Sequence, residues 1–264
     1  MDSNLNDARP RALFLADSHF HVDRGGDEQA RLEGFVALLE RFAGVPEVVL
    51  LGDIFDFWFD YPHFVMKGYG ALLEALDRAR AAGSRLHFVG GNHDIWAAPY
   101  LHERYGTAVG GGPVTLELDG RRVRCIHGDG VLGRDLLYRI FRAIVRHPAG
   151  VGLGKSLHPE LLFAFSSWLS GNSRHSTRDE IEGIEAKARR WLAHQRDPQW
   201  DHLVMGHVHH AFTTEHAGRR LSTLGGWLEP RCYATWEDGG LRHLEDDRET
   251  PSGTAAPSRS PVAR

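Results

Sequence analysis

The stretch at residues 48–56 constrains the fold of this chain more than any other. It reads Val-Val-Leu-Leu-Gly-Asp-Ile-Phe-Asp, so a short apolar run stops at Gly52 and a carboxylate, Asp53, follows at once. A run of this composition predicts a strand that is buried on both faces, as in a parallel sheet. Gly52 permits a tight turn, and ligands of open α/β sheets gather at the carboxyl ends of strands. We therefore expect Asp53 to lie at a ligand site, where its carboxylate can bridge two cations.

The same arrangement, an apolar run followed by Asp, Asn or His, recurs four more times along the chain. Each block alone also fits an ordinary loop, an Asn-containing turn or a hairpin end. The block that contains two histidines after a glycine is the strongest, because such a pair is a familiar arrangement of metal ligands. Together the blocks predict one common site. They are Asp17-Ser18-His19, Gly91-Asn92-His93-Asp94, His127-Gly128-Asp129 and Gly206-His207-Val208-His209.

The blocks supply oxygen and nitrogen donors and no thiolate. This donor set favours Mn²⁺, Fe²⁺ or Zn²⁺ over a structural zinc site of the cysteine type. One cation needs fewer ligands than the blocks offer, whereas two cations that share Asp53 use all of them. Such pairs lie ~3.5–4 Å apart and serve the hydrolysis of phosphate esters. The candidate ligands are Asp17, His19, Asp53, Asn92, His127, His207 and His209.

Composition excludes several other classes of protein. The 264 residues are 42% apolar and carry a formal net charge of −4, which argues for one globular domain and against general nucleic-acid binding. Two cysteines, Cys125 and Cys232, are too few for a disulfide framework, so we expect a reducing, cytoplasmic compartment. No apolar run approaches the ~18 residues of a membrane span. Residues 1–10 lack a signal-peptide core, and we expect both 1–10 and 246–264 to be disordered.

Hydrophobic periodicity predicts alternating strands and helices as far as residue 89, which implies a parallel sheet with right-handed crossovers. Beyond residue 113 the pattern changes to a hairpin, a long helical segment and then short strands. The expected strands are 11–16, 48–51, 85–89, 114–118, 121–126, 202–205, 211–216, 219–224, 231–236 and 241–244. The expected helices are 27–43, 64–82, 136–145, 161–169 and 177–195.

The five blocks, in this order, resemble those of the calcineurin-like metallophosphoesterase superfamily over residues 13 to about 244. The resemblance implies an α/β fold, a four-layer α/β/β/α sandwich of two mixed β-sheets. It also implies a domain over 11–245 with a helical cap insertion at about 130–178. By the same resemblance, one cation is held by Asp17, His19, Asp53 and His209. The second is held by Asp53, Asn92, His127 and His207.

The resemblance also assigns roles to neighbouring residues. It implies that His93 stabilises or protonates a phosphate oxygen and that Asp94 orients His93. Asp56 is expected behind the ligands, and Asp129 is expected to orient one of them, although a structural role is as good an interpretation for both. Two cations lower the pKa of water and neutralise charge on phosphoryl oxygens, so this chemistry agrees with phosphoester hydrolysis.

A finer resemblance links the chain to the UDP-2,3-diacylglucosamine pyrophosphohydrolases of lipid A synthesis. It rests on Arg-Asp-x-x-Tyr-x-x-Phe-Arg at 134–142, Ser-Gly-Asn-Ser-Arg at 170–174, Asp-Ile-Phe-Asp-Phe-Trp at 53–58 and Leu-Gly-Gly-Trp at 224–227. It implies cleavage of a pyrophosphate to UMP and a diacylglucosamine 1-phosphate, with acyl chains held by the helical insertion. The implied substrate contacts are Asp135, Asn172, Ser173 and Arg178.

The insertion is basic, with seven Lys and Arg against two Asp and Glu over 130–178. Apolar residues interleave with these charges at 136–145, which predicts a basic amphipathic helix. Such a helix suits an anionic surface such as the inner membrane, or a lipid phosphate. A plain cap helix that packs its apolar face on the core is an equally good interpretation. We expect a UDP-linked glycolipid as the partner, with no nucleic acid and no stable protein partner.

One block departs from the lipid enzymes. Many of them have Arg where this chain has His93, so the block reads Asn-His-Asp as in the general superfamily. A general phosphodiesterase or phosphatase that acts on nucleotides or small phosphoesters therefore stays open as an alternative. A metal-free scaffold is a third hypothesis, but such a scaffold should lack some ligands, and this chain has them all.

Overall fold

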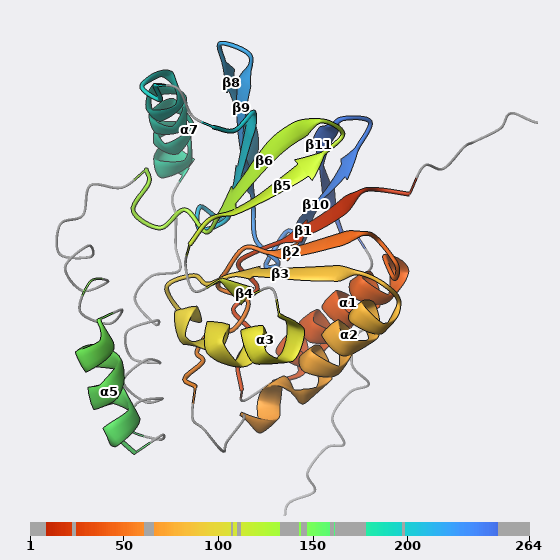
Figure 1. The fold of residues 1–264 in the computed structure, drawn as a ribbon, viewed down its shortest axis with the longest axis vertical. Helices are drawn as coiled ribbons and strands as arrows, with labels where there is room; N and C mark the ends of the chain where they lie inside the picture. The colour runs from red at the N-terminus through yellow and green to blue at the C-terminus, as the bar shows by residue number, and fades with distance from the viewer. Residues whose placement is uncertain are drawn as a thin grey trace, which may run out of the picture.

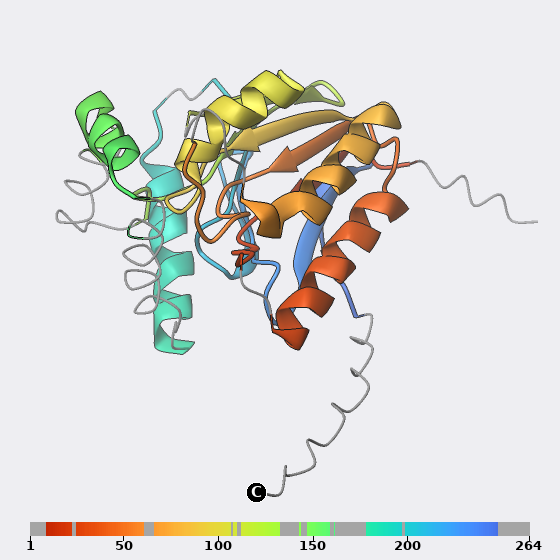
Figure 2. The ribbon, with the colours of Figure 1, turned by 90° about the horizontal axis from the view of Figure 1, so that it is seen from below.

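The structure is a computed structural model that describes residues 9–22, 25–60, 66–106, 108–109, 112–132, 143, 147–158, 161, 178–196 and 199–247. Over these ranges the chain has an α/β fold in which two mixed β-sheets pack face to face, with helices on the two outer faces (Figures 1 and 2). The expected α/β/β/α sandwich is therefore confirmed. No helix of these ranges combines the length and the apolar content that a membrane crossing requires.

The first sheet has six strands in the described ranges, in the order β11-β10-β1-β2-β3-β4. Neighbours from β1 to β4 pair in parallel, while β10 is antiparallel to β1 and to β11. The carboxyl ends of β1, β2 and β3 therefore lie along one edge. The strands are β1 (Ala12–Leu15), β2 (Glu47–Leu50), β3 (Arg85–Val89), β4 (Ala108–Val109), β10 (Cys232–Glu237) and β11 (Gly240–Glu245).

The second sheet has five strands in the described ranges, in the order β5-β6-β7-β9-β8. Its inner strands β6, β7 and β9 are parallel, and the edge strands β5 and β8 are antiparallel to their neighbours. The carboxyl ends of β6 and β7 thus also share one edge. The strands are β5 (Val114–Leu118), β6 (Arg121–Ile126), β7 (His202–Met205), β8 (Ala211–His216) and β9 (Arg219–Leu224).

The helices cover the outer faces. In Figure 1, α1, α2 and α3 lie against the first sheet and α7 stands beside β8 and β9 of the second. The helical elements are α1 (Gly26–Arg41), η1 (Lys67–Tyr69), α2 (Gly70–Ala81), η2 (Ile95–Ala97), α3 (Ala98–Tyr105), α5 (Pro148–Ser156) and α7 (Arg178–Ala193).

Alternation along the strands divides the core into three layers. Phe14 and Val49 face the second sheet, where they meet Val123 and Val204 in the layer between the sheets. Their neighbours along the strands pack on the other face, under α1, α2 and α3. A third layer lies between α7 and the outer face of the second sheet. The central strand β1 is apolar throughout because both of its faces are buried.

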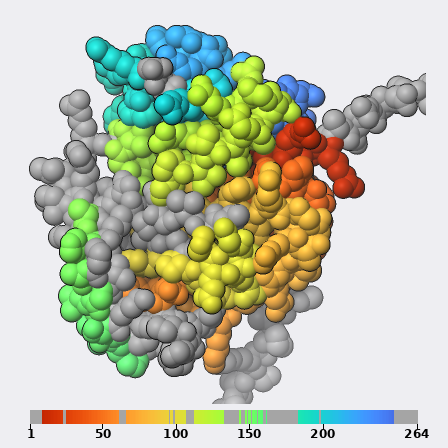
Figure 3. All heavy atoms as spheres, viewed as in Figure 1, coloured from red at the N-terminus to blue at the C-terminus, as the bar shows by residue number. Residues whose placement is uncertain are grey.

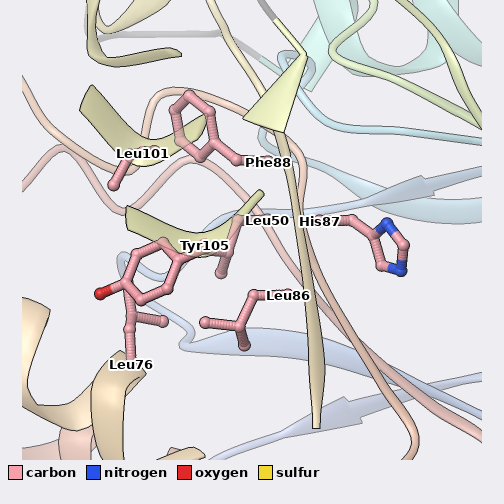
Figure 4. A pocket seen from close by; sticks show the side chains of 7 residues that line it. All are labelled: Leu50, Leu76, Leu86, His87, Phe88, Leu101 and Tyr105. Carbon is pink, nitrogen blue, oxygen red and sulfur yellow. The ribbon is translucent and has the colours of Figure 1, made fainter. Parts of the chain in front are cut away.

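The layer under α2 and α3 is closely packed. It leaves a cavity of only about 10 Å³, room for no more than about one water molecule (Figure 4). His87 lies on the other side of β3 from the apolar side chains of this cavity, and its Nε2 is 2.7 Å from Glu47 Oε2. This cavity is therefore too small for a substrate.

The expected secondary structure holds at nearly every strand, and the differences concern helices. The helix expected at 64–82 begins only with η1 at Lys67, while 61–65 lie outside the described residues. Neither α3 nor β4 was predicted, although Pro99 and Gly106 are typical punctuation of a short helix. The glycine-rich helix α5 was also missed, because glycine lowers helix propensity.

Most of the remaining expectations fall outside the described residues. The helices expected at 136–145 and 161–169 lie outside the described residues, except for residues 143 and 161. The terminal residues 1–8 and 248–264 also lie outside them. The cap insertion and the disordered termini therefore stay predictions.

Candidate metal centre

The site is built by the loops that follow β1, β2, β3, β6 and β7. These loops hold an unusual backbone, because most of the candidate ligands have positive φ angles that non-glycine residues rarely adopt. Residues held in this way cluster at functional sites, where the surrounding structure maintains the strain. The φ angles are 50° at Asp17, 44° at His19, 51° at Asp53, 68° at His207 and 54° at His209.

Glycines let the loops approach one another. A Cβ atom on Gly52 would lie 2.6 Å from the backbone nitrogen of Gly91 and 2.7 Å from His127 Nδ1. A Cβ atom on Gly206 would lie 2.8 Å from Asp17 Oδ2. These glycines are needed because backbone and ligand side chains pack directly against them.

The first group of donors comprises Asp17, His19 and His209, whose ligand atoms lie within 4.8 Å of one another. His209 Nε2 is 3.4 Å from Asp17 Oδ1 and 3.3 Å from His19 Nε2. The backbone N–H of His207 donates to Asp17 Oδ2 over 2.7 Å. Asp17 Oδ1 is buried and has no hydrogen bond within the described part of the chain. A buried, unsatisfied carboxylate oxygen that faces two imidazoles fits a cation.

The second group comprises Asp53, His127 and His207, again within 4.8 Å. His127 Nε2 is 3.4 Å from Asp53 Oδ2 and 3.2 Å from Asn92 Oδ1. His127 Nδ1 is 2.7 Å from the carbonyl oxygen of Leu51, so it carries the proton and donates. That hydrogen bond orients the ring and leaves Nε2 to ligate a metal.

Asp53 lies between the two groups. Its Oδ2 is 3.4 Å from His127 Nε2 on one side and 3.9 Å from His19 Nε2 on the other. The His and Asp groups are therefore consistent with a dinuclear metal site that shares Asp53. The structure brings the seven candidate ligands to one place, and their assignment to the individual cations stays a prediction.

The electrostatics favour positive charge beside Asp53. Burial raises the pKa of Asp53, but the charge and hydrogen bond of His127 outweigh burial and hold that pKa well below its usual range. Burial lowers the pKa of His127, yet the charge of Asp53 raises it to about 10. Burial, with the charge of His127, lowers the pKa of His207 to about 4. The site therefore stabilises a positive charge at its centre, whether a proton or a cation carries it.

Comparison with known proteins agrees with this geometry. A family model described as calcineurin-like phosphoesterase matches residues 10–211. The chain belongs to this family. It is 28% identical over 266 residues to a UDP-2,3-diacylglucosamine hydrolase of Porphyromonas gingivalis. That alignment covers 90% of this chain and 97% of the relative. A UDP-2,3-diacylglucosamine hydrolase of Aeromonas salmonicida is 30% identical over 240 residues, or 87% of this chain and 91% of the relative. Among solved structures, an archaeal phosphodiesterase aligns with a TM-score of 0.44 and 10% identity over 89% of this chain and 98% of that chain.

His93 lies at the rim of the metallophosphoesterase site and is partly exposed. Its Nδ1 is 2.9 Å from the carbonyl oxygen of Asp56, and its ring centroid is 4.8 Å from that of His19. The carbonyl of Asp56 holds this ring, and the orientation of His93 by Asp94 stays a prediction.

Asp94 fixes the turn that carries Asp53. Its buried carboxylate accepts hydrogen bonds from the backbone N–H groups of Gly91 (2.8 Å), Asp53 (3.1 Å) and Ile54 (2.7 Å). Burial, together with the charge of Asp53, raises the pKa of Asp94 to about 6. Four backbone donors in all point at this one side chain, the last from Phe55 (3.2 Å), so Asp94 ties the second and third loops together.

Two further residues near the phosphoesterase site were missed. His21 Nδ1 lies 3.2 Å from Asp56 Oδ2, and the spacing of His19 and His21 was the signal that could have revealed it. Arg31 of α1 donates to the carbonyl oxygens of Ser18, His19 (3.3 Å) and Trp227 (2.8 Å), and it pairs with Glu28. No local pattern distinguishes Arg31 from any other polar residue of an amphipathic helix.

The remaining candidates are not brought into the site by the structure. Asp135, Asn172 and Ser173 lie outside the described residues, and Arg178 begins α7 with a side chain that is also outside them. Asp129 is buried. The substrate contacts therefore stay predictions from the sequence.

Proposed function

We propose that this phosphoesterase hydrolyses the pyrophosphate bond of UDP-2,3-diacylglucosamine to give UMP and 2,3-diacylglucosamine 1-phosphate. The observation that carries the proposal is the alignment with proteins named UDP-2,3-diacylglucosamine hydrolase over 87–90% of this chain. The metal-ligand set supports the reaction type, because paired cations suit attack on a phosphorus centre.

When bound, two divalent cations supply an acidified water molecule and neutralise the charge that builds on phosphoryl oxygens. The proposal assigns Mn²⁺, with Fe²⁺ or Zn²⁺ as alternatives. Asp17, His19 and His209 would hold one cation, Asn92, His127 and His207 would hold the other, and Asp53 would be shared between them. His93 is held through Nδ1, and the proposal assigns to the Nε2–H of its imidazolium form the donation of a proton to a phosphoryl oxygen. Asp94 keeps the Asp53 turn in place.

The proposal places the protein on the cytoplasmic face of the inner membrane. Leu153, Leu157 and Leu161 support this, because these large apolar side chains are 67%, 43% and 65% exposed. Figure 3 shows the atoms of α5, which carries Leu153, at the outer margin of the molecule. The excess of basic residues over 130–178 would favour anionic lipid. The proposal includes no nucleic acid and no stable protein partner.

The test is release of UMP from UDP-2,3-diacylglucosamine by Mn²⁺-supplemented protein, measured beside hydrolysis of bis(4-nitrophenyl) phosphate. The proposal predicts that kcat/KM for the lipid exceeds that for the small ester by at least about 100-fold, since remote binding energy from the acyl chains and uridine favours the transition state. Turnover of the small ester with no UMP release from the lipid would reject the substrate and keep the reaction type.

A general phosphodiesterase or phosphatase is the second candidate, and His93 is the observation that favours it. The Asn-His-Asp block matches the broad superfamily rather than many of the lipid enzymes. The two candidates differ in the assay above, and a panel of nucleotides in the same assay would identify the better small substrate. A metal-free scaffold predicts no Mn, Fe or Zn in protein purified without chelator.

A further inference from the structure

A second cavity lies on the outer face of the five-stranded sheet, away from the metal ligands. It has a volume of about 470 Å³, which falls in the range of ~300–1,000 Å³ that is typical of small-molecule pockets. Its walls come from β6, β7 and the last turn of α7, together with Gln195, Gln199 and Trp200. In Figure 1, α7 stands beside β8 and β9, which it contacts.

Arg124 on β6 provides the charge of this cavity. Its side chain is partly buried, and within the described residues it makes no hydrogen bond or ion pair. Its neighbours on the adjacent strands are Thr115 and Leu203, which are neutral, and none of the described residues that line the cavity is acidic. A guanidinium that is partly withdrawn from water and lacks a counter-charge favours an anionic ligand with two oxygens.

Arg122 makes the contrast clear. It lies two residues earlier on the same strand and therefore on the same face of the sheet. Unlike Arg124 it has an acidic neighbour, because its Nε is 3.8 Å from Asp201 Oδ2 and its backbone N–H donates to the same carboxylate. Within the described residues, Asp201 thus balances the positive charge of Arg122, whereas Arg124 has no such acidic partner.

Two indole side chains, those of Trp191 and Trp200, are among the residues that line the cavity. Trp200 is only 4% exposed and belongs to the core layer under α7, so its ring is fixed. Trp191 lies on α7 and packs at the edge of that layer. Aromatic walls of this kind favour a planar ring, which can stack on them or meet them edge to face. Gln195 and Gln199 add amide groups that can bind polar atoms of such a ring.

The C-terminus of α7 does not oppose an anion here. A helix C-terminus carries partial negative charge on its free carbonyl groups. In α7 these carbonyls are occupied: His194 N–H donates to Arg190 (3.2 Å), Gln195 N–H to Leu192 (3.1 Å) and Gln195 Nε2 to Trp191 (3.3 Å).

We propose that this cavity binds a small planar anion, a flat unsaturated ring that bears one carboxylate or phosphate group, at a site separate from the metal centre. The anionic group pairs with Arg124 and the ring lies against Trp191 and Trp200. A nucleoside monophosphate and an aromatic carboxylate both have this chemistry.

Titration of intrinsic tryptophan fluorescence in the full-length, Mn²⁺-loaded protein tests the proposal. The probes are UMP and 4-hydroxybenzoate, with uridine and inorganic phosphate to separate ring from charge. We expect saturable binding of at least one probe, and little response to uridine or phosphate alone. Arg124→Gln should weaken that binding at least about 10-fold, the usual effect of a lost charge-assisted hydrogen bond, while Arg122→Gln changes it less than twofold.

Further variants keep the result interpretable. Arg124→Lys keeps the charge and should retain part of the binding, which separates loss of charge from loss of folding. UMP is also a product of the proposed reaction and could bind at the metal centre. If UMP binding is lost in Asp53→Ala and kept in Arg124→Gln, the binding belongs to the metal centre and the proposal is overturned. Equal effects of the two arginine variants, no effect of Trp191→Leu, or no binding of either probe would also overturn it.

Discussion

The two halves of the metal centre are held in different ways. His127 has a side chain that is 1% exposed, and a backbone carbonyl at the end of β2 orients it from behind. His209 has a side chain that is 32% exposed. The neighbouring His19 loop is held by Arg31, a side chain that reaches across from α1. One half is fixed by the sheet interior and the other by side chains at its margin. We therefore expect the cation beside His127 to bind more tightly and to exchange more slowly than the cation beside His209.

Asp53→Ala should disrupt both halves of the metal centre, and the difference between them should disappear. Asp53 is the only one of the seven ligands that lies within 4 Å of imidazoles from each group. We expect activity to fall by more than the ~10²–10³-fold that one lost electrostatic contact costs. Elemental analysis of the purified variant should show that both metals are depleted. Activity near that of the wild type would contradict a shared aspartate.

His93→Ala should leave both halves intact and slow the chemical step. His93 is held by the Asp56 carbonyl at the rim, where it can reach a phosphoryl oxygen. Loss of a positioned proton donor costs ~10²–10⁴-fold in kcat. The measurement is kcat together with metal content in the same preparation. If the variant loses metal instead, His93 is a ligand and its assignment here is wrong.

Arg31→Ala should affect one half alone. Without its hydrogen bonds to Ser18 and His19, the loop that carries Asp17 and His19 loses its support. Residues that support ligands are worth ~10–100-fold in metal affinity. Calorimetric titration with Mn²⁺ should show the weaker site weakened further and the tighter site unchanged.

Two variants control for a general effect on α1. Arg31→Lys should recover part of the affinity, because it keeps a donor at that position. Arg41→Ala lies on the same helix and contacts Tyr233 rather than the ligand loop, so it should leave both sites unchanged. Equal weakening of both sites by Arg31→Ala would remove the distinction between the two halves.

The ligands could be predicted from the sequence because each one follows an apolar run directly. A parallel sheet brings the ends of its strands to one edge, so position along the chain was enough to place Asp17, Asp53 and Asn92 together. The strands themselves were predictable for the same reason, since burial on both faces leaves a continuous apolar signature.

The supporting contacts could not be predicted, because they join segments that are far apart in the sequence. Arg31 and Trp227 are 196 residues apart, and nothing near either residue indicates that they meet. The contacts of Asp94 have the same origin, because the four backbone donors that converge on its carboxylate depend on the folded arrangement of two loops.

A buried histidine outside the metal centre gives the smallest expected effect. Burial, with the charge of Arg220, lowers the pKa of His202 to about 4, whereas Asp53 raises that of His127. Since the folded pKa lies below the unfolded value of ~6.5, protons bind the unfolded state more tightly. The contribution of neutral His202 is thus complete above about pH 6.5 and is lost as the pH falls towards about 4.

Between pH 7 and pH 4.5, the free energy of unfolding should therefore fall less in His202→Gln than in the wild type. The two decreases should differ by about 2–3 kcal/mol. Urea unfolding at the two pH values measures this difference. His216→Gln replaces an exposed histidine and should behave as the wild type does. The same acid sensitivity in His202→Gln and wild type would show that His202 does not titrate as its burial implies.

Anomalous diffraction from Mn²⁺-soaked crystals tests the central claim most directly. Two peaks ~3.5–4 Å apart should flank the Asp53 carboxylate, one near His19 and His209 and the other near His127 and His207. The peak beside His127 should have the higher occupancy at limiting Mn²⁺. A single peak, or two peaks that do not share Asp53, would contradict the account.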